Sequence, residues 1–478
     1  MPIRPTRRTL LTGAAAIAGA AMLPRVPLAA DPGKPNDPKP NDPKPIDPKP
    51  IDLAAAPARL PLVGRGHPET LVWAYNDRVP GPELRFRQGD TARIAFANGL
   101  PEVTTIHWHG LRVPNNMDGV PHLSQTEVPP GGRFAYEFAL KDAGTFWYHP
   151  HSNSGVQLAH GLSGAFIVEE REPIRVDRDL LWVLGDWRLT KEAEIAGGFG
   201  HPMDSTHAGR IGNTVTVNGA ILDEVPVRAG ERIRLRLINT ANARVFALEF
   251  KGHAPQVIAL DGQPVQPHAP RDGKVILAPG QRADLVLDMA GKPGERFDVV
   301  DGFYPRMAYR LTRLTYGAEA PLRDSPLDAP IALAPNPLPE PDLANAVRQD
   351  VILDGGMHGN MPKGAGPRGP FWALNGQAPM GHHMPPLITA KRGQTLVTTF
   401  VNETGWWHPM HLHGFPFRVL KHNGEPTPHR EWRDTVLLGP QETAEIAFVA
   451  EEAGDWMLHC HILEHQETGM MAVLKVTA

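Results

Sequence analysis

Four pairs of histidines, each pair separated by one residue, are the part of the chain best suited to chemistry. The pairs are His107 and His109, His149 and His151, His411 and His413, and His459 and His461. On a β-strand, residues two apart point to the same face, so each pair presents two imidazoles on one side. Eight neutral nitrogen donors suit a cluster of several borderline metal ions. One such pair alone would more simply be a solvated or core pair, whereas four equivalent pairs favour a metal cluster.

The single cysteine indicates a second site. Cys460 lies between His459 and His461, so on a strand its side chain faces the opposite side from theirs. Together with His408, His465 and Met470 it gives two imidazoles, one thiolate and one thioether, which is the ligand set of a blue-copper electron-transfer site. The alternatives are a zinc site or a buried free thiol. If the copper interpretation is right, one tripeptide links the two sites through its backbone.

The histidine pairs fall into a threefold internal repeat. Each copy has a Gly followed nine residues later by an Asn: Gly89 and Asn98, Gly230 and Asn239, and Gly393 and Asn402. Polar and apolar residues partly alternate between them, which is typical of a half-buried strand. The first and third copies carry His pairs nine residues after the Asn, whereas the second copy has Leu248 there. We therefore expect the middle repeat to be a spacer that sets the outer two against each other.

Composition supports an all-β protein. The 51 prolines and 47 glycines disfavour long helices and favour short strands joined by turns. Each repeat has the size of one β-sandwich domain, and we place the domains at 53–172, 173–335 and 336–478. Net charge is −4, from 48 basic and 52 acidic residues, which argues against a nucleic-acid partner.

The N-terminal 52 residues are expected to lie outside these domains. Residues 1–30 read as a twin-arginine export signal: Arg7-Arg8, a mildly apolar stretch too short to span a membrane, and a small-residue cleavage site at Leu28-Ala29-Ala30. A disordered basic tail is the alternative. Residues 31–52 repeat Lys, Pro and Asp, which favours a semi-rigid tether. We therefore expect a periplasmic or secreted protein with no membrane span; the sequence gives no indication of its oligomeric state.

The body of the chain after residue 53 resembles the three-domain, laccase-like multicopper oxidases of bacterial copper-oxidase type. Four motifs carry the resemblance: His107-Trp108-His109-Gly110, His149-Pro150-His151, the stretch from His408 to Gly414, and His459-Cys460-His461 through Met470. It implies three cupredoxin-like Greek-key sandwiches and four copper ions. The implied ligands are His408, Cys460, His465 and Met470 for type 1 copper; His107 and His411 for type 2; and His109, His149 and His461 for one type 3 copper, with His151, His413 and His459 for the other.

The resemblance also implies a source of protons. Asp118 stands eleven residues after His107, where family members carry an acidic residue that delivers protons near the cluster. Reduction of O2 to water consumes protons, so a carboxylate donor is chemically suitable. The alternative is an ordinary turn aspartate, since Asp is common in turns. Some relatives carry Glu directly after the third histidine of the cysteine motif, but Gln466 stands here, which leaves a second proton donor open.

The implied reaction couples four one-electron oxidations of a donor to reduction of O2 to two waters. We expect a phenol or similar aromatic donor to dock near His408 or His465, whose imidazole edge should approach the surface. Trp406 and Trp407 precede His408 and could shape the mouth of that site; the alternative for one of them is packing in the core. The alternative is a periplasmic Cu(I) oxidase, for which the methionines and histidines of 357–384 could recruit the metal; such methionines can equally fill gaps in a core. A non-catalytic cupredoxin scaffold is disfavoured by the complete ligand set.

Overall fold

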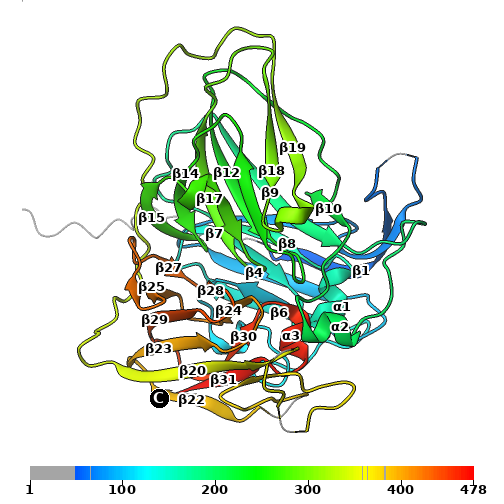
Figure 1. Ribbon diagram of the computed structural model, residues 1–478, viewed down its shortest axis with the longest axis vertical. Helices are drawn as coiled ribbons and strands as arrows, with labels where there is room; N and C mark the ends of the chain where they lie inside the picture. The colour runs from blue at the N-terminus through cyan, green and yellow to red at the C-terminus, as the bar shows by residue number, and fades with distance from the viewer. Residues whose placement is uncertain (1–48, 65, 358, 363, 382–383) are drawn as a thin grey trace, which may run out of the picture. The chain divides into compact units, whose positions relative to one another are not determined.

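The computed structural model describes residues 49–478, apart from 65, 358, 363 and 382–383. In this part the chain forms three successive β-sandwiches, each made of two sheets, which Figure 1 shows in blue to cyan, in green and in yellow to red. This is the predicted all-β, cupredoxin-like fold. No helix of the described part is long and apolar enough to cross a membrane. The predicted signal, 1–30, and all but the last four residues of the tether lie outside the described residues.

The first sandwich packs the sheet β2-β1-β4-β6 against the sheet β3-β8-β7-β5. Its first strand starts within the predicted tether, because Ile51 and Asp52 already pair with Ile94 and Ala95. The tether prediction is thus two residues too long. The elements are β1 (Ile51–Leu60), β2 (Thr70–Tyr75), β3 (Gly81–Arg87), β4 (Thr91–Asn98), β5 (His107–His109), η1 (Asn115–Met117), β6 (Arg133–Ala139), β7 (Gly144–His149), α1 (Ser154–Ala159) and β8 (Gly164–Glu169).

The second sandwich has sheets of order β10-β9-β12-β17-β14-β15 and β11-β19-β18-β13-β16. Its elements are β9 (Arg178–Trp187), α2 (Pro202–Thr206), β10 (Thr214–Val217), β11 (Val225–Val227), β12 (Arg232–Asn239), β13 (Phe246–Phe250), β14 (Gln256–Leu260), β15 (Gln263–His268), η2 (Arg271–Gly273), β16 (Val275–Leu277), β17 (Arg282–Asp288), β18 (Arg296–Asp301), η3 (Pro305–Met307) and β19 (Tyr309–Tyr316).

The third sandwich packs β21-β20-β23-β29-β25-β26, with β27 on β25, against β22-β31-β30-β24-β28. Its elements are β20 (Val347–Gly355), β21 (Trp372–Leu374), β22 (Pro386–Lys391), β23 (Thr395–Asn402), β24 (His408–Leu412), β25 (Phe417–His422), β26 (Glu425–Pro426), β27 (Trp432–Arg433), β28 (Thr435–Leu438), β29 (Thr443–Val449), β30 (Gly454–Cys460), α3 (Leu463–Glu467) and β31 (Met471–Thr477).

The repeated asparagine ends the same strand in all three sandwiches. Each side-chain amide donates to two backbone carbonyls, and its oxygen accepts from the N–H two residues on. Asn402, for example, donates to the carbonyls of Trp406 and Gly439 and accepts from the Thr404 N–H. Asn98 and Asn239 make the same three bonds. The buried amide thereby satisfies the loop that leads, in the first and third sandwiches, to a histidine strand.

Strand β12 departs from the predicted half-buried pattern, because all eight of its residues are buried. Two of its arginines, Arg234 and Arg236, contact the first sandwich and are neutralised there and on their own sheet. Arg234 pairs with Asp284 at 2.6 Å and with Glu170 at 2.7 Å. Arg236 pairs with Asp179 at 2.8 Å and donates to Oγ1 of Thr145 at 2.9 Å. Buried charges require such partners, so polar residues alternate along the strand although both faces are covered.

Candidate metal centre

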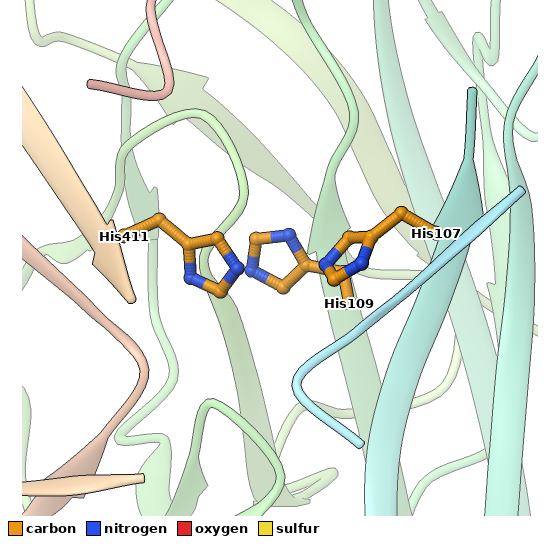
Figure 2. Close-up of side chains that lie close together, drawn as sticks. All are labelled: His107, His109 and His411. Carbon is orange, nitrogen blue, oxygen red and sulfur yellow. The ribbon is translucent and has the colours of Figure 1, made fainter. Parts of the chain in front are cut away.

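The histidine pairs lie on neighbouring strands within each outer sandwich. In the first, His107 on β5 is directly opposite His149 at the end of β7. In the third, His411 on β24 is opposite His459 on β30. Figure 2 shows the ring of His411, from the third sandwich, facing the rings of His107 and His109, from the first; the His109 and His411 centroids are 3.8 Å apart. Two pairs of strands therefore bring eight imidazoles together between the outer sandwiches.

All eight imidazoles are buried, and they form three groups of possible ligand atoms within 4.8 Å of one another. The groups are His107, His109 and His411; His109, His149 and His461; and His151, His413 and His459. The last two groups have the composition that the resemblance implies for the two type 3 coppers, and the first contains both histidines implied for type 2 copper. The second and third groups each combine residues of two sandwiches.

The ring nitrogens that face the cluster lack protein partners. His107, His149, His151 and His411 each have a buried Nε2, and His109 a buried Nδ1, with no hydrogen-bond partner. The Nε2 atoms of His413 and His459 lie 3.1 Å apart. Unsatisfied buried nitrogens are costly, and a bound cation removes that cost. The donor set therefore fits metal ions that accept imidazole, copper among them.

The opposite ring nitrogens of most of these histidines are held by protein oxygens. Nδ1 of His107 donates to the carbonyl of Asp118, and Nδ1 of His411 to that of Asp434, both at 2.8 Å. Nδ1 of His149 donates to the carbonyl of Pro150 at 3.0 Å. A proton fixed on one nitrogen leaves the lone pair of the other for a metal. The chain therefore orients the cluster ligands before any metal binds.

Burial also keeps the imidazoles in the metal-binding form. It lowers the pKa of His109, His149, His151, His413, His459 and His461 well below the usual range, and neighbouring imidazoles add to the effect. These rings are therefore neutral near pH 7. Neutral imidazole is the form that coordinates metal.

The second site lies on the other side of β30. Sγ of Cys460 is 3.6 Å from Nδ1 of His408 and 3.7 Å from Nδ1 of His465, and those two nitrogens are 3.1 Å apart. Met470 is fully buried in the same core, and its backbone bonds to both Cys460 and His465. Burial raises the pKa of the Cys460 thiol, so a thiolate here requires a bound cation. Three converging ligand atoms beside a methionine fit a blue-copper site.

The two sites are joined by the backbone of His459 and Cys460. Nδ1 of His459 donates to the carbonyl oxygen of Cys460 at 2.9 Å. His459 belongs to the cluster and Cys460 to the second site, so a covalent path and a hydrogen bond run between them. The sequence predicted the covalent path; the hydrogen bond is seen only in the structure.

The expected exposure of an imidazole edge at the second site is wrong. Both His408 and His465 are fully buried. Nε2 of His408 lies 2.8 Å from Oγ1 of Thr404, and Nε2 of His465 donates to the carbonyl of His207 at 2.7 Å. The loop after α2 therefore covers the edge of His465. The half-buried Trp406 packs on the ring of His207, and Trp407, 38% exposed, packs on Phe303.

Asp118 lies at the junction of the outer sandwiches. It is 1% exposed, and its Oδ2 accepts from Nδ1 of His413 at 2.8 Å. Its other oxygen, Oδ1, lies 3.3 Å from Nδ1 of His107 and has no hydrogen-bond partner. Asp118 follows η1, where its N–H donates to the carbonyl of Asn115, and its carboxylate is buried against the cluster.

Gln466, at the position where the sequence left a second proton donor open, is buried. Oε1 of Gln466 has no hydrogen-bond partner. Glu467, by contrast, is exposed, and its carboxylate accepts from the Gly155 N–H at 2.7 Å. In the segment 357–384, Met357, Met361 and Met380 are exposed, whereas His358, His382 and His383 lie outside the described residues.

Sequence reasoning missed two charged residues beside the cluster. Asp434, just before β28, accepts from Nε2 of His109 at 3.1 Å. Arg282, the first residue of β17, pairs with Asp434 at 2.6 Å. Neither residue belongs to the histidine or cysteine motifs. No local pattern marked either one, because the partners that give them their role lie far away in the chain.

Three cupredoxin-like sandwiches with a histidine cluster between the outer two, and a cysteine site joined to it, define a copper-dependent oxidase. The chain belongs to the multicopper oxidase family: models of that family match residues 62–173, 178–309 and 349–478. Members carry four copper ions and use O2 as the electron acceptor, and the described histidine groups suit those ions.

Solved structures show the same family over nearly the whole body. A multi-copper oxidase from Pseudomonas thermotolerans is 36% identical with a TM-score of 0.81, covering 90% of this chain and 99% of that one. A multicopper oxidase from Campylobacter jejuni, described as a metallo-oxidase, is 26% identical with a TM-score of 0.74, covering 89% and 91%. The laccase-like CueO of an Ochrobactrum species, described as active towards lignin model compounds, is 27% identical with a TM-score of 0.74, covering 89% and 97%.

Proposed function

We propose that the buried side chains hold the four coppers of the family in the arrangement implied by the motifs. The proposed ligands are His408, Cys460, His465 and Met470 for type 1; His107 and His411 for type 2; and His109, His149, His461 with His151, His413, His459 for the type 3 pair. The support is that these side chains are buried and converge in groups of matching composition. When bound, the coppers take electrons singly from a donor and reduce O2 to two waters.

We further propose that the first cupredoxin domain, which begins with β1, ends at 172, that the second spans 173–335 and that the third spans 336–478. In support, β8 ends at Glu169 and β9 begins at Arg178, while β19 ends at Tyr316 and β20 begins at Val347. Each boundary therefore falls between sandwiches. On this division all proposed ligands come from the first and third domains.

A side chain of the protein is proposed to supply the protons that the reaction consumes. Asp118 is proposed to supply protons for the reduction of O2 at the histidine cluster, because its carboxylate is buried within hydrogen-bond distance of Nδ1 of His413. Reduction of O2 to water consumes four protons for four electrons, and a positioned carboxylate suits that transfer.

Electrons are proposed to enter over His207. The observation that carries this is the 2.7 Å hydrogen bond from Nε2 of His465 to the carbonyl of His207, because it links a proposed ligand of the buried site to a half-buried residue. The ring of His207 packs on Trp406 at 4.8 Å, and both are half-buried. An aromatic donor such as a phenol can pack on this pair without touching His465. We therefore propose laccase-like oxidation of small aromatic donors at this surface.

A second donor, Cu(I), is favoured by a separate observation. Met203 on α2 is 56% exposed, and Met357 is 39% exposed. The Met357 N–H donates to the carbonyl of Thr206, and its own carbonyl accepts from Nε1 of Trp406. Thioethers are soft ligands that suit Cu(I). Exposed methionines thus border the same electron-entry surface.

Oxygen uptake by the copper-loaded protein, with Cu(I) and a methoxyphenol compared side by side, tests the two donors. For an aromatic donor, Trp406→Leu should lower phenol turnover threefold to tenfold, as expected from ~0.5–1.5 kcal/mol per aromatic contact, and leave Cu(I) turnover nearly unchanged. For Cu(I), the double variant Met203→Leu/Met357→Leu should lower Cu(I) turnover alone. Met307→Leu, equally exposed on η3 of the second sandwich, is the control. Equal turnover in all variants would rule out this entry surface.

We also propose export to the periplasm or beyond, supported by the Arg7-Arg8 pattern and the apolar stretch after it. Replacing both arginines by lysine should keep the protein in the cytoplasmic fraction. Unchanged export would contradict the twin-arginine interpretation.

A further inference from the structure

The middle sandwich, which supplies no proposed ligand, reaches the histidine cluster through the turn before β17. Gly280 in that turn has a φ of +85°. A Cβ at Gly280 would lie 2.9 Å from Cδ2 of His461 and 3.0 Å from Cε1 of His109. A side chain at this position would clash with both rings, so only glycine fits here. One imidazole from each outer sandwich therefore packs directly against this turn.

Arg282 follows in the same turn and ties the three sandwiches together. Its guanidinium is fully buried and binds the carboxylate of Asp434 through two parallel hydrogen bonds, of 2.8 and 2.6 Å. Its Nε donates to the carbonyl of Thr145 in the first sandwich at 3.2 Å. Such a two-pronged pair fixes both the position and the rotation of a carboxylate.

Asp434 in turn orients one histidine from each outer sandwich. Its Oδ1 accepts from Nε2 of His109 at 3.1 Å, and its carbonyl accepts from Nδ1 of His411 at 2.8 Å. His109 is therefore protonated on Nε2 and presents Nδ1, whereas His411 presents Nε2. Both of these atoms, Nδ1 of His109 and Nε2 of His411, have no hydrogen-bond partner. The two rings use opposite nitrogens because Asp434 accepts from opposite nitrogens.

We propose that Arg282 is a positioning residue of the copper cluster. By holding Asp434 it fixes the Nε2–H tautomer of His109 and so leaves Nδ1 for metal. This rests on the proposed ligand assignment. It gives the middle sandwich a part in the site beyond spacing the outer two. Partners of this kind behind metal ligands commonly change metal affinity 10–100-fold.

Gly110, the last residue of the first histidine motif, agrees with this role. Its φ is +86°, and a Cβ there would overlap Nη2 of Arg282 and lie 2.6 Å from Oδ2 of Asp434. The residue directly after His109 must therefore be small for the arginine and aspartate to meet. The glycine of the first histidine motif therefore makes room for the pair formed by Arg282 and Asp434.

The test compares Arg282→Lys, which keeps the charge but loses the two-pronged bond, with Arg232→Lys. Arg232 makes an equivalent bidentate pair with Asp288 on the same sheet, with bonds of 2.7 and 3.0 Å, and has no described contact with the histidine cluster. Copper per chain is measured during challenge with a chelator, and the blue absorbance of the Cys460 site is followed in parallel. Asp434→Asn is the second variant, in case the lysine restores the contact.

In Arg282→Lys and Asp434→Asn we expect cluster copper to be lost about 10–100-fold more readily, with blue absorbance per chain unchanged. Arg232→Lys should match the wild type. In copper-free protein with ¹⁵N-labelled histidine rings, the His109 signal should lose its pure Nε2–H character in both variants. The signal is assigned by its absence in His109→Gln.

Two results would overturn the proposal. One is wild-type retention of all four coppers in Arg282→Lys and Asp434→Asn. The other is parallel loss of blue absorbance and cluster copper, which would indicate a general structural role. If the proposed function itself is wrong, the wild-type protein will not bind four coppers. That result differs from both outcomes above.

Discussion

Asp118 accepts a hydrogen bond from Nδ1 of His413 at 2.8 Å, across the junction between the first and third sandwiches. Its free oxygen, Oδ1, lies 3.3 Å from Nδ1 of His107. One carboxylate thus faces two histidines assigned to different coppers. If copper fills the cluster, Asp118 would be placed to supply protons for the reduction of O2 there.

Replacing Asp118 with Asn keeps an oxygen acceptor for His413 but removes the acid. Oxygen uptake should fall about 100-fold or more, the usual contribution of a positioned acid, while copper content stays at four per chain. Oxygen-electrode rates and metal analysis check this. A variant that loses copper together with activity would instead show that Asp118 only holds the ligands.

Cys460→Ser should abolish the blue absorbance and reduce donor oxidation to the uncatalysed background, because Ser offers no thiolate to the type 1 ion. Cluster copper should remain, since the cluster imidazoles are held from elsewhere. Metal analysis and visible absorption measure both effects. Met470→Leu is the companion variant: it should keep the blue absorbance and raise the reduction potential, because the axial ligand tunes that potential.

Gly110→Ala and Gly131→Ala form a matched pair. Both glycines have positive φ, +86° and +75°, but a Cβ at Gly131 meets nothing within 4 Å. Gly131→Ala should cost only backbone strain, about 1–2 kcal/mol in the free energy of unfolding. Gly110→Ala should cost more and also release cluster copper. Denaturant unfolding and copper content separate the two; equal losses would mean that Arg282 and Asp434 move aside freely.

Asn402→Ala should lower the free energy of unfolding by about 2–4 kcal/mol, because two buried carbonyls and one N–H lose their partners at about 1 kcal/mol or more each. The loop that it ties leads into β24, so blue absorbance should weaken as well. Asn345→Ala, at an exposed asparagine bonded to Asp342, is the control and should change stability by less than about 0.5 kcal/mol. Urea titrations followed by fluorescence provide the measurement.

The copper-free protein should lose stability as the pH falls below about 6.5. Burial holds the pKa of His109, His149, His151 and other cluster histidines far below that of the unfolded chain. Between the two pKa values the unfolded state binds more protons, so the free energy of unfolding declines by about 1.4 kcal/mol per pH unit for each such histidine.

Urea unfolding at pH 7.5, 6.5 and 5.5 measures this loss. Most of it should fall between pH 6.5 and 5.5 and exceed the amount expected of one histidine. Copper-loaded protein should be more stable at each pH but decline with a similar slope, because the folded rings carry no proton in either form and the unfolded chain takes up the same protons. A decline no larger than that of one histidine in the copper-free protein would contradict the burial of these rings as neutral imidazoles.

Much of the site could be predicted because its ligands are local patterns on strands. The spacing of His459, Cys460 and His461 places two side chains on one face and one on the other, whatever the rest of the chain does. The threefold repeat predicted where the strands lie. Leu248, which stands where the other two repeats have a histidine, indicated that the middle sandwich differs from them. The prediction that β12 is half-buried was wrong. Alternating arginines predict one face in solvent, but here a second domain covers that face.

The sequence by itself determined the all-β repeat and which side chains, in which repeats, are proposed as ligands, since these follow from side-chain chemistry and strand periodicity. Only the tertiary structure decided which ring nitrogen each histidine presents, because that depends on partners far away in the chain, such as His109 and Asp434. It likewise decided that His465 is covered by His207 and that Arg282 stands behind the cluster. Hydrogen-bond partners of buried groups come from packing between domains, and no local pattern encodes them.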